Sequence, residues 1–181
     1  DRNLFGFEIP ATWFQSVNSA FIILFSPLFA ALWILLAKRN IDLSSPAKFA
    51  IGLALAGVGF LVMVFAANRV VASGGTVLVS PWWLIISYLF QTLGELFLSP
   101  VGLSSMTKLA PRRYVGQMMG IWFLATSVGN LVAGLVGGHV DPTKLDQTPL
   151  VFSGTAIALF GATVILALMI VPIRRLMATA K

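Results

Sequence analysis

The sequence of 181 residues contains no cysteine, only one histidine (His139) and few charged residues, which make up 10% of the chain. Without cysteine there can be no disulfide bond and no thiolate ligand, and a single histidine cannot build a convincing zinc site. Soluble domains typically carry about 25% charged residues, so the charges here are too few to cover a surface that faces water. The composition therefore excludes an ordinary soluble domain and indicates an integral membrane protein.

Negative charge is the scarcer of the two signs, with six acidic residues against 12 lysine and arginine residues. A net charge of +6 could indicate nucleic-acid binding, but that function requires basic residues gathered in one patch or stripe. Here the basic residues occur in short clusters between apolar runs, which is typical of the loops of a membrane protein. We therefore expect a lipid bilayer around the chain and no nucleic-acid partner.

Hydrophobic residues make up 58% of the chain and are concentrated in five long runs. A helix needs about 20 apolar residues to cross the hydrocarbon core of a bilayer, and each run has about this length. Alternating strands of about ten residues, which would indicate a membrane barrel, are absent, so each run is expected to be helical. The predicted fold class is all-α, a polytopic transmembrane helical bundle. The predicted spans are residues 11–37, 49–67, 82–106, 114–138 and 150–172.

The connections between the runs predict how the helices are oriented. The first and third connections and the C-terminal tail hold three basic residues each, whereas the N-terminal segment and the other two connections hold one each. By the positive-inside rule, the C-terminus is then cytoplasmic and the first residue of the chain lies on the outer side. The basic residues of the richer group are Lys38, Arg39, Lys48, Lys108, Arg112, Arg113, Arg174, Arg175 and Lys181, against Arg2, Arg69 and Lys144.

The first residues carry no initiator methionine and no targeting signal, although five spans with an outer N-terminus follow. We therefore expect the chain to be the C-terminal part of a longer protein. A processed or separately encoded subunit is the alternative.

Small residues recur at helical spacing in three of the runs. Because lipid tails are as apolar as leucine, membrane helices associate by close packing of such residues, so each stripe predicts a helix contact. Pro27 and Pro100 fall inside runs, where each is expected to kink its helix. The three stripes are Gly52, Ala56 and Gly59; Gly129, Ala133 and Gly137; and Gly154, Ala158 and Ala162.

One carboxylate interrupts the third run. Glu95 lies thirteen residues after Trp82, about 20 Å along a helix that rises 1.5 Å per residue. A carboxylate at this depth costs at least about 2.5 kcal/mol, and it normally faces a bundle interior or a water-filled cavity. Helical spacing puts Gln91 and Ser99 on the same face. We interpret Glu95 as functional, with a structural hydrogen bond from its protonated form to another helix as the alternative.

Other polar or aromatic residues at depth are open to two interpretations. Asn18 in the first run can either join helices or bind a ligand. Trp122 in the fourth run lies deeper than an interfacial tryptophan needs to be, and it shares a face with Thr126. Either core packing or the wall of a pocket would account for that position.

The residues that catalysis needs are missing from the sequence. There is no Gly-rich phosphate loop with a lysine, no serine–histidine pair at depth and no second acid within a run. We therefore expect no enzymatic activity, no metal site and no cofactor.

Three segments, taken together, resemble one known family: WFQSVNSAFIILFSPLFAALW, GELFLSPVGLSSMTKLAP and GQMMGIWFLATSVGN. In this order and spacing they resemble the C-terminal half of the proton-coupled oligopeptide transporters, a family within the major facilitator superfamily. The resemblance covers essentially the whole chain and implies that its five spans are helices eight to twelve of a twelve-helix core. It also implies symport of di- and tripeptides with protons across the plasma (inner) membrane by alternating access, together with an N-terminal helical half.

The resemblance assigns substrate-binding roles to five residues. Glu95 matches a glutamate implicated in binding the free amino group of the peptide and in a salt bridge with a lysine of the N-terminal half. Asn18 matches an asparagine near that amino end. Ser99 and Trp122 match pocket positions, and Thr126 falls on a pocket-facing position. An ammonium group offers three donors, which a carboxylate flanked by amide and hydroxyl acceptors can satisfy.

The match has one departure within the chain, since the family usually has proline after the asparagine and this chain has Ser19. The family's proton-coupling residues in the N-terminal half and the seventh helix lie outside these residues. Two other functions stay open from the sequence. One is a major facilitator carrier of a non-peptide substrate, such as nitrate, a drug or a modified amino acid. The other is a membrane accessory subunit that transports nothing.

Overall fold

Five long helices account for most of the computed structural model, which describes residues 3–4, 7–8, 10–40, 43–138, 144 and 146–179. The predicted all-α bundle with five apolar helices is confirmed, and each helix is long and apolar enough to cross a membrane. His139, the single histidine, lies outside the described residues. The helices are α1 (Ala11–Lys38), α2 (Ser45–Ala72), α3 (Trp82–Leu109), α4 (Val115–Gly138) and α5 (Gln147–Thr179). A 3₁₀ turn, η1 (Arg112–Tyr114), and a two-stranded antiparallel pair, β1 (Asn3–Leu4) and β2 (Phe7–Glu8), complete the fold.

The helices extend past the apolar runs from which they were predicted, most clearly in α2. This helix begins at Ser45, with Pro46 in its first turn, where a missing backbone N–H costs no helical hydrogen bond. It continues through Arg69, whose guanidinium lies over the Trp83 ring at 5.5 Å. Hydropathy marks the hydrocarbon-facing part of a helix, whereas backbone hydrogen bonding continues through polar residues at the interface.

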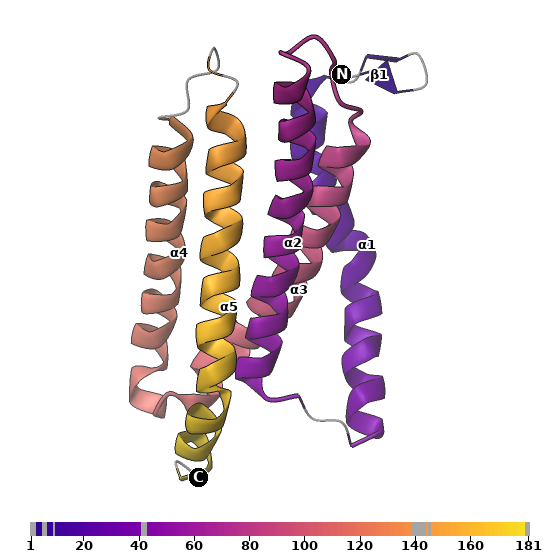
Figure 1. The fold of residues 1–181 in the computed structure, drawn as a ribbon. Helices are drawn as coiled ribbons and strands as arrows, with labels where there is room; N and C mark the ends of the chain where they lie inside the picture. Colours follow the sequence, from indigo (N-terminus) through magenta and orange to yellow (C-terminus); the bar gives the residue numbers. More distant parts are fainter. Residues whose placement is uncertain are drawn as a thin grey trace.

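Successive helices run in opposite directions, so that the connections alternate between the two ends of the bundle (Figure 1). The α1–α2 connection, the turn between α3 and α4 and the C-terminus share one end, while the N-terminus and the α2–α3 connection share the other. Eight of the nine residues of the richer basic group therefore lie in or beside segments at one end of the molecule, while Lys181 lies outside the described residues.

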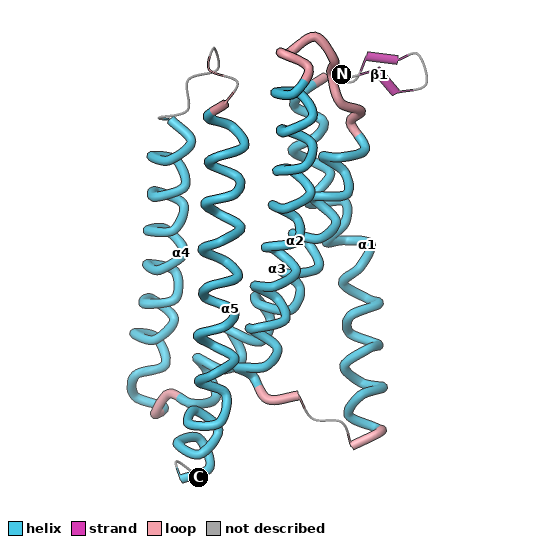
Figure 2. The backbone as a smooth tube through the Cα atoms, viewed as in Figure 1, coloured by secondary structure: helices cyan, strands magenta, loops and turns pink. Residues whose placement is uncertain are grey.

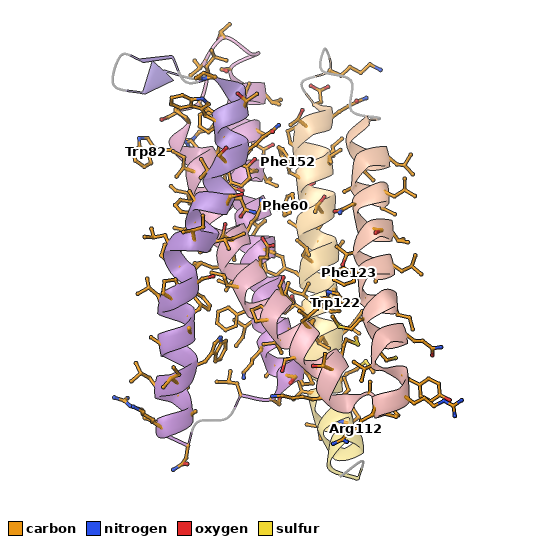
Figure 3. All side chains as sticks on the ribbon, turned by 180° about the vertical axis from the view of Figure 1, so that it is seen from behind. Phe60, Trp82, Arg112, Trp122, Phe123 and Phe152 are labelled. Atoms are coloured by element: carbon orange, nitrogen blue, oxygen red, sulfur yellow. The ribbon has the colours of Figure 1, made fainter. Side chains whose placement is uncertain are left out.

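The centre of the packing is α2, which contacts both α3 and α5, and α3 in turn contacts α1 and α4. Phe60 of α2 and Phe152 of α5 meet with ring centroids 6.4 Å apart (Figure 3). The α4 helix is exposed on every side from Phe123 to Gly138. The α1 helix also has a prominent exposed surface, and it bends about half-way along its length, near the Pro27 that lies inside it (Figure 2).

Glycine allows the backbones of α2 and α3 to approach closely. A Cβ atom added to Gly94 would lie 2.6 Å from the carbonyl oxygen of Gly52, and one added to Gly52 would lie 2.8 Å from that of Gly94. Two turns further along α2, the buried hydroxyl of Ser87 donates to the carbonyl oxygen of Gly59 at 2.8 Å. The small-residue stripe of α2 therefore lies at a helix contact, as its spacing predicts.

The glycines of the other two predicted stripes are not at close contacts between described residues. Nothing lies within 4 Å of a Cβ atom placed on Gly129, Gly137 or Gly154. On α5 the contact with α2 instead involves the Phe160 ring, which packs against Gly57.

Candidate functional site

The bundle brings together two of the five predicted site residues, Asn18 from α1 and Glu95 from α3. The side-chain Nδ2 of Asn18 donates a hydrogen bond to Oε2 of Glu95 over 3.4 Å. The two residues are 77 positions apart in the sequence, so the pair exists only because α1 packs against α3.

Thr92 is a third member of this group, which the sequence analysis missed. Its Oγ1 donates to Oδ1 of Asn18, and the residue is 0% exposed. Thr92 precedes Glu95 by three residues, so helical spacing alone puts it on nearly the same face. That spacing was the signal that could have pointed to it.

Both ends of the Asn18 amide are engaged within the bundle, and its role in substrate binding stays a prediction. We expected its amide to serve as an acceptor for an ammonium group. In the structure the amide nitrogen donates to the Glu95 carboxylate, while the carbonyl oxygen already accepts from Thr92. Asn18 thus supplies one hydrogen-bond donor to Glu95, and an ionised carboxylate can only accept such bonds.

Glu95 is exposed on the outside of the described bundle, and Ser99 lies exposed one turn further along α3. In the described part of the chain, Glu95 has no lysine or arginine partner. Gln91, predicted to share its face, instead donates to the Ser87 hydroxyl at 3.0 Å and belongs to the α2–α3 contact. The carboxylate therefore has one amide donor and an open side.

Trp122 and Thr126 of α4 lie in a different setting from this pair. Trp122 is half-buried and reaches from α4 to α3, where a Cβ atom on Gly102 would lie 2.1 Å from its ring (Figure 3). Its ring also meets Phe49 of α2 edge to face at 6.3 Å. Thr126 is exposed, and its hydroxyl donates to the Trp122 carbonyl oxygen at 3.0 Å. These contacts tie Trp122 to helix packing and do not link either residue to Asn18 or Glu95.

A separate cavity of about 440 Å³ lies where α1, α2 and α3 meet at the N-terminal end of the bundle. Its lining is mainly apolar, including Phe14, Met63 and Trp83, with polar groups from Gln15 and Tyr88. None of the five predicted site residues lines it.

Comparison with known proteins identifies the family of the chain. The sequence profile that describes the POT family matches residues 1–151 of the chain. The chain belongs to the POT family. This membership confirms the resemblance to proton-coupled oligopeptide transporters that the three sequence segments carry.

Relatives within the POT family are transporters. A peptide transporter of Yersinia enterocolitica subsp. palearctica is 55% identical over 177 residues, which are 98% of this chain and 34% of the relative. A crystal structure of the peptide transporter POT in complex with sulfate has a TM-score of 0.85 and 35% identity, covering 97% of this chain and 34% of that one. A POT family transporter crystallised with 5-aminolevulinic acid has a TM-score of 0.77 and 31% identity, covering 92% and 33%.

The chain thus spans about a third of the length of the POT relatives that it matches. The five helices and the POT family together establish a multi-pass membrane protein with the fold of this transporter family.

Proposed function

We propose that the five helices form the C-terminal half of a carrier that moves di- and tripeptides together with protons across the plasma (inner) membrane. The observation that carries this proposal is the exposed Glu95, which has one amide donor and no basic partner in the described chain. A carboxylate half-way along a membrane helix is costly when it faces lipid, so this face is turned toward protein or a water-filled cavity. The N-terminal half of the carrier faces Glu95 and shields it from lipid.

The counter-charge of Glu95 comes from outside these helices. In the empty carrier it is a lysine of the N-terminal half, and in the loaded carrier it is the ammonium group of the substrate. Exchange between these two partners keeps the carboxylate neutralised while the two halves rock around the site. Asn18 supports the carboxylate, and Ser99 is the exposed hydroxyl one turn further along α3 that can accept from the ammonium. Trp122 and Thr126 of α4 complete the proposed pocket wall.

The orientation that we propose has the C-terminus in the cytoplasm and the first residue of the chain on the outer side. The three basic-rich segments at one end of the bundle support it, because lysine and arginine are retained on the cytoplasmic side. Protons are the coupling ion, and no further cofactor is required.

The test is uptake of a labelled dipeptide into proteoliposomes that contain the full-length carrier, with an inward proton gradient imposed. Uptake should be gradient-dependent and should be competed by a panel of unlabelled di- and tripeptides. A second candidate function is transport of a small amino-acid derivative, which the relative crystallised with 5-aminolevulinic acid favours. Uptake of that compound unaffected by the peptide panel would favour the second function and contradict the first.

The intact mass of the purified native protein should be about three times 19.4 kDa, because these residues correspond to 34% of the Yersinia relative. Mass spectrometry of the detergent-solubilised protein measures it directly. A native mass close to 19.4 kDa would contradict the two-halves carrier and favour a membrane accessory subunit.

A further inference from the structure

We propose that Thr92 is a positioning residue for the substrate site, and that it fixes the amide of Asn18 so that the NH₂ group faces Glu95. The inference rests on the proposed function, since it explains how the acid that would receive the substrate ammonium is prepared. Thr92 acts through Asn18, because its hydroxyl bonds to the amide and not to the carboxylate.

The Thr92 hydroxyl bonds to another helix, which among the described helical hydroxyls it shares with Ser87. A hydroxyl on a membrane helix ordinarily donates to a carbonyl oxygen three or four residues earlier in its own helix. Six other helical hydroxyls do so here, namely Thr107, Thr126, Ser127, Ser153, Thr155 and Thr163. Thr92 instead reaches across to α1, although a bond within α3 would satisfy it equally well. The bond to Asn18 is therefore a specific feature of this contact.

The chemistry of the three groups then admits one arrangement when Glu95 is charged. The ionised carboxylate only accepts hydrogen bonds, so it requires the NH₂ end of the Asn18 amide. If the amide were reversed, its carbonyl oxygen would face the carboxylate oxygen, and two acceptors would oppose each other. Thr92 donates to the carbonyl oxygen of the Asn18 amide and so holds the NH₂ group toward Glu95.

This arrangement leaves room for a substrate at Glu95. A carboxylate has about four acceptor positions, and Asn18 occupies one of them on Oε2. An arriving ammonium group can bind the remaining positions without displacing Asn18. Thr92 would thus keep one fixed donor on the acid while the cationic partner changes.

A purely structural role for Thr92 is the alternative, and the chain offers a matched control for it. Ser87 is the other buried hydroxyl on α3, at 1% exposure against 0% for Thr92, and it also bonds across to another helix. Its acceptor is the carbonyl oxygen of Gly59, and no bond connects it to Asn18 or Glu95. Ser87→Ala therefore removes a buried interhelical hydrogen bond without touching the proposed relay.

The experiment is infrared spectroscopy of the full-length carrier without substrate, using the carboxylate band that Glu95→Gln removes. Thr92→Val, which keeps the shape but loses the hydroxyl, should shift this band because the amide is no longer held against the carboxylate. Thr92→Ser should restore the wild-type position, and Ser87→Ala should leave it unchanged. An unshifted band in Thr92→Val, or an equal shift in Ser87→Ala, would overturn the proposal.

The folded state of each variant is checked by gel filtration and circular dichroism, with Thr92→Ala as a second hydroxyl-free variant. If neither Thr92→Val nor Thr92→Ala folds while Ser87→Ala does, Thr92 is needed for the fold and the positioning role is contradicted. The infrared measurement needs no substrate, so it tests the role of Thr92 even if the wild-type carrier moves no dipeptide. Absence of dipeptide transport would contradict only the proposed function.

Where the wild-type carrier does transport dipeptides, a second readout follows. Thr92→Val should raise the KM for a dipeptide with a free amino group by roughly 3- to 10-fold, the scale of one hydrogen bond between neutral groups, and leave the maximal rate much less affected. Inhibition by the N-acetylated dipeptide, which lacks the ammonium group, should change little. An equal loss of affinity for both peptides would contradict action through Glu95.

Discussion

Replacement of Glu95 by Gln should reduce dipeptide uptake by the full-length carrier by roughly 100-fold or more, which is the effect of losing one desolvated charge pair. The glutamine amide has nearly the same shape as the carboxylate, but it carries no charge to balance the substrate ammonium. Its carbonyl oxygen can still accept the hydrogen bond that Asn18 donates to Oε2 in the native chain, so the substitution removes mainly the charge. Initial rates of labelled dipeptide uptake, normalised to the amount of reconstituted protein, measure the effect.

The matched control is Asp146→Asn, which makes the same acid-to-amide change at an exposed residue outside the helices. It should leave uptake within about twofold of the wild type, because exposed surface charges contribute little. Wild-type uptake in Glu95→Gln, or an equal loss in Asp146→Asn, would remove Glu95 from the substrate site. In that case its bond to Asn18 would be a structural link between α1 and α3.

The fold and the importance of Glu95 could be predicted from the sequence because the bilayer imposes strong rules on both. Apolar runs of about 20 residues have few alternatives to a helix when no water satisfies the backbone. A carboxylate within such a run is expensive wherever it points, so its significance does not depend on the packing. Depth and helical face follow from residue counting along α3.

Side-chain contacts between helices could not be predicted from the sequence. The contact of Asn18 with Glu95 and Thr92 depends on the height and rotation at which α1 crosses α3, and neither is encoded within one run. Helical spacing alone placed Gln91 beside Glu95, but its amide turns to Ser87 at the α2–α3 contact. The direction of the Asn18 amide was also beyond sequence reasoning, since it follows from which neighbour donates.

The small-residue stripes also show that the sequence of one helix does not identify the helix that it contacts. The stripe on α2 meets α3, whereas a Cβ atom added to Gly129 or Gly137 on α4 would meet no other described helix within 4 Å. A stripe predicts that a helix can be approached closely, but it does not identify the approaching helix. Trp122 is a further example, because either of its two interpretations fits the sequence, and its packing on Gly102 is visible only in the fold.

Gly94→Ala should lower the stability of the helical bundle by about 2–3 kcal/mol, the upper range for inserting a methyl group into a packed interior. The added Cβ atom would lie 2.6 Å from the Gly52 carbonyl oxygen and 3.1 Å from the Ala56 backbone nitrogen. Both obstacles belong to the backbone of α2, so no side-chain rotation can relieve the overlap. Loss of folded protein on stepwise heating in detergent, followed by gel filtration, measures the change.

Gly94→Ala should also displace the predicted substrate-binding residue Glu95, because Gly94 directly precedes it and the added methyl group pushes α3 away from α2. A small shift of α3 would lengthen the bond from Asn18, which already spans 3.4 Å, so uptake per folded molecule should fall as well.

Gly154→Ala is the matched control, since a Cβ atom there meets nothing within 4 Å. Replacing glycine by alanine in an unobstructed helix should be neutral or stabilising by up to about 1 kcal/mol, so the two identical substitutions are expected to differ in sign. Equal thermal behaviour of the two variants would show that the close approach of α2 and α3 does not limit the stability of the bundle.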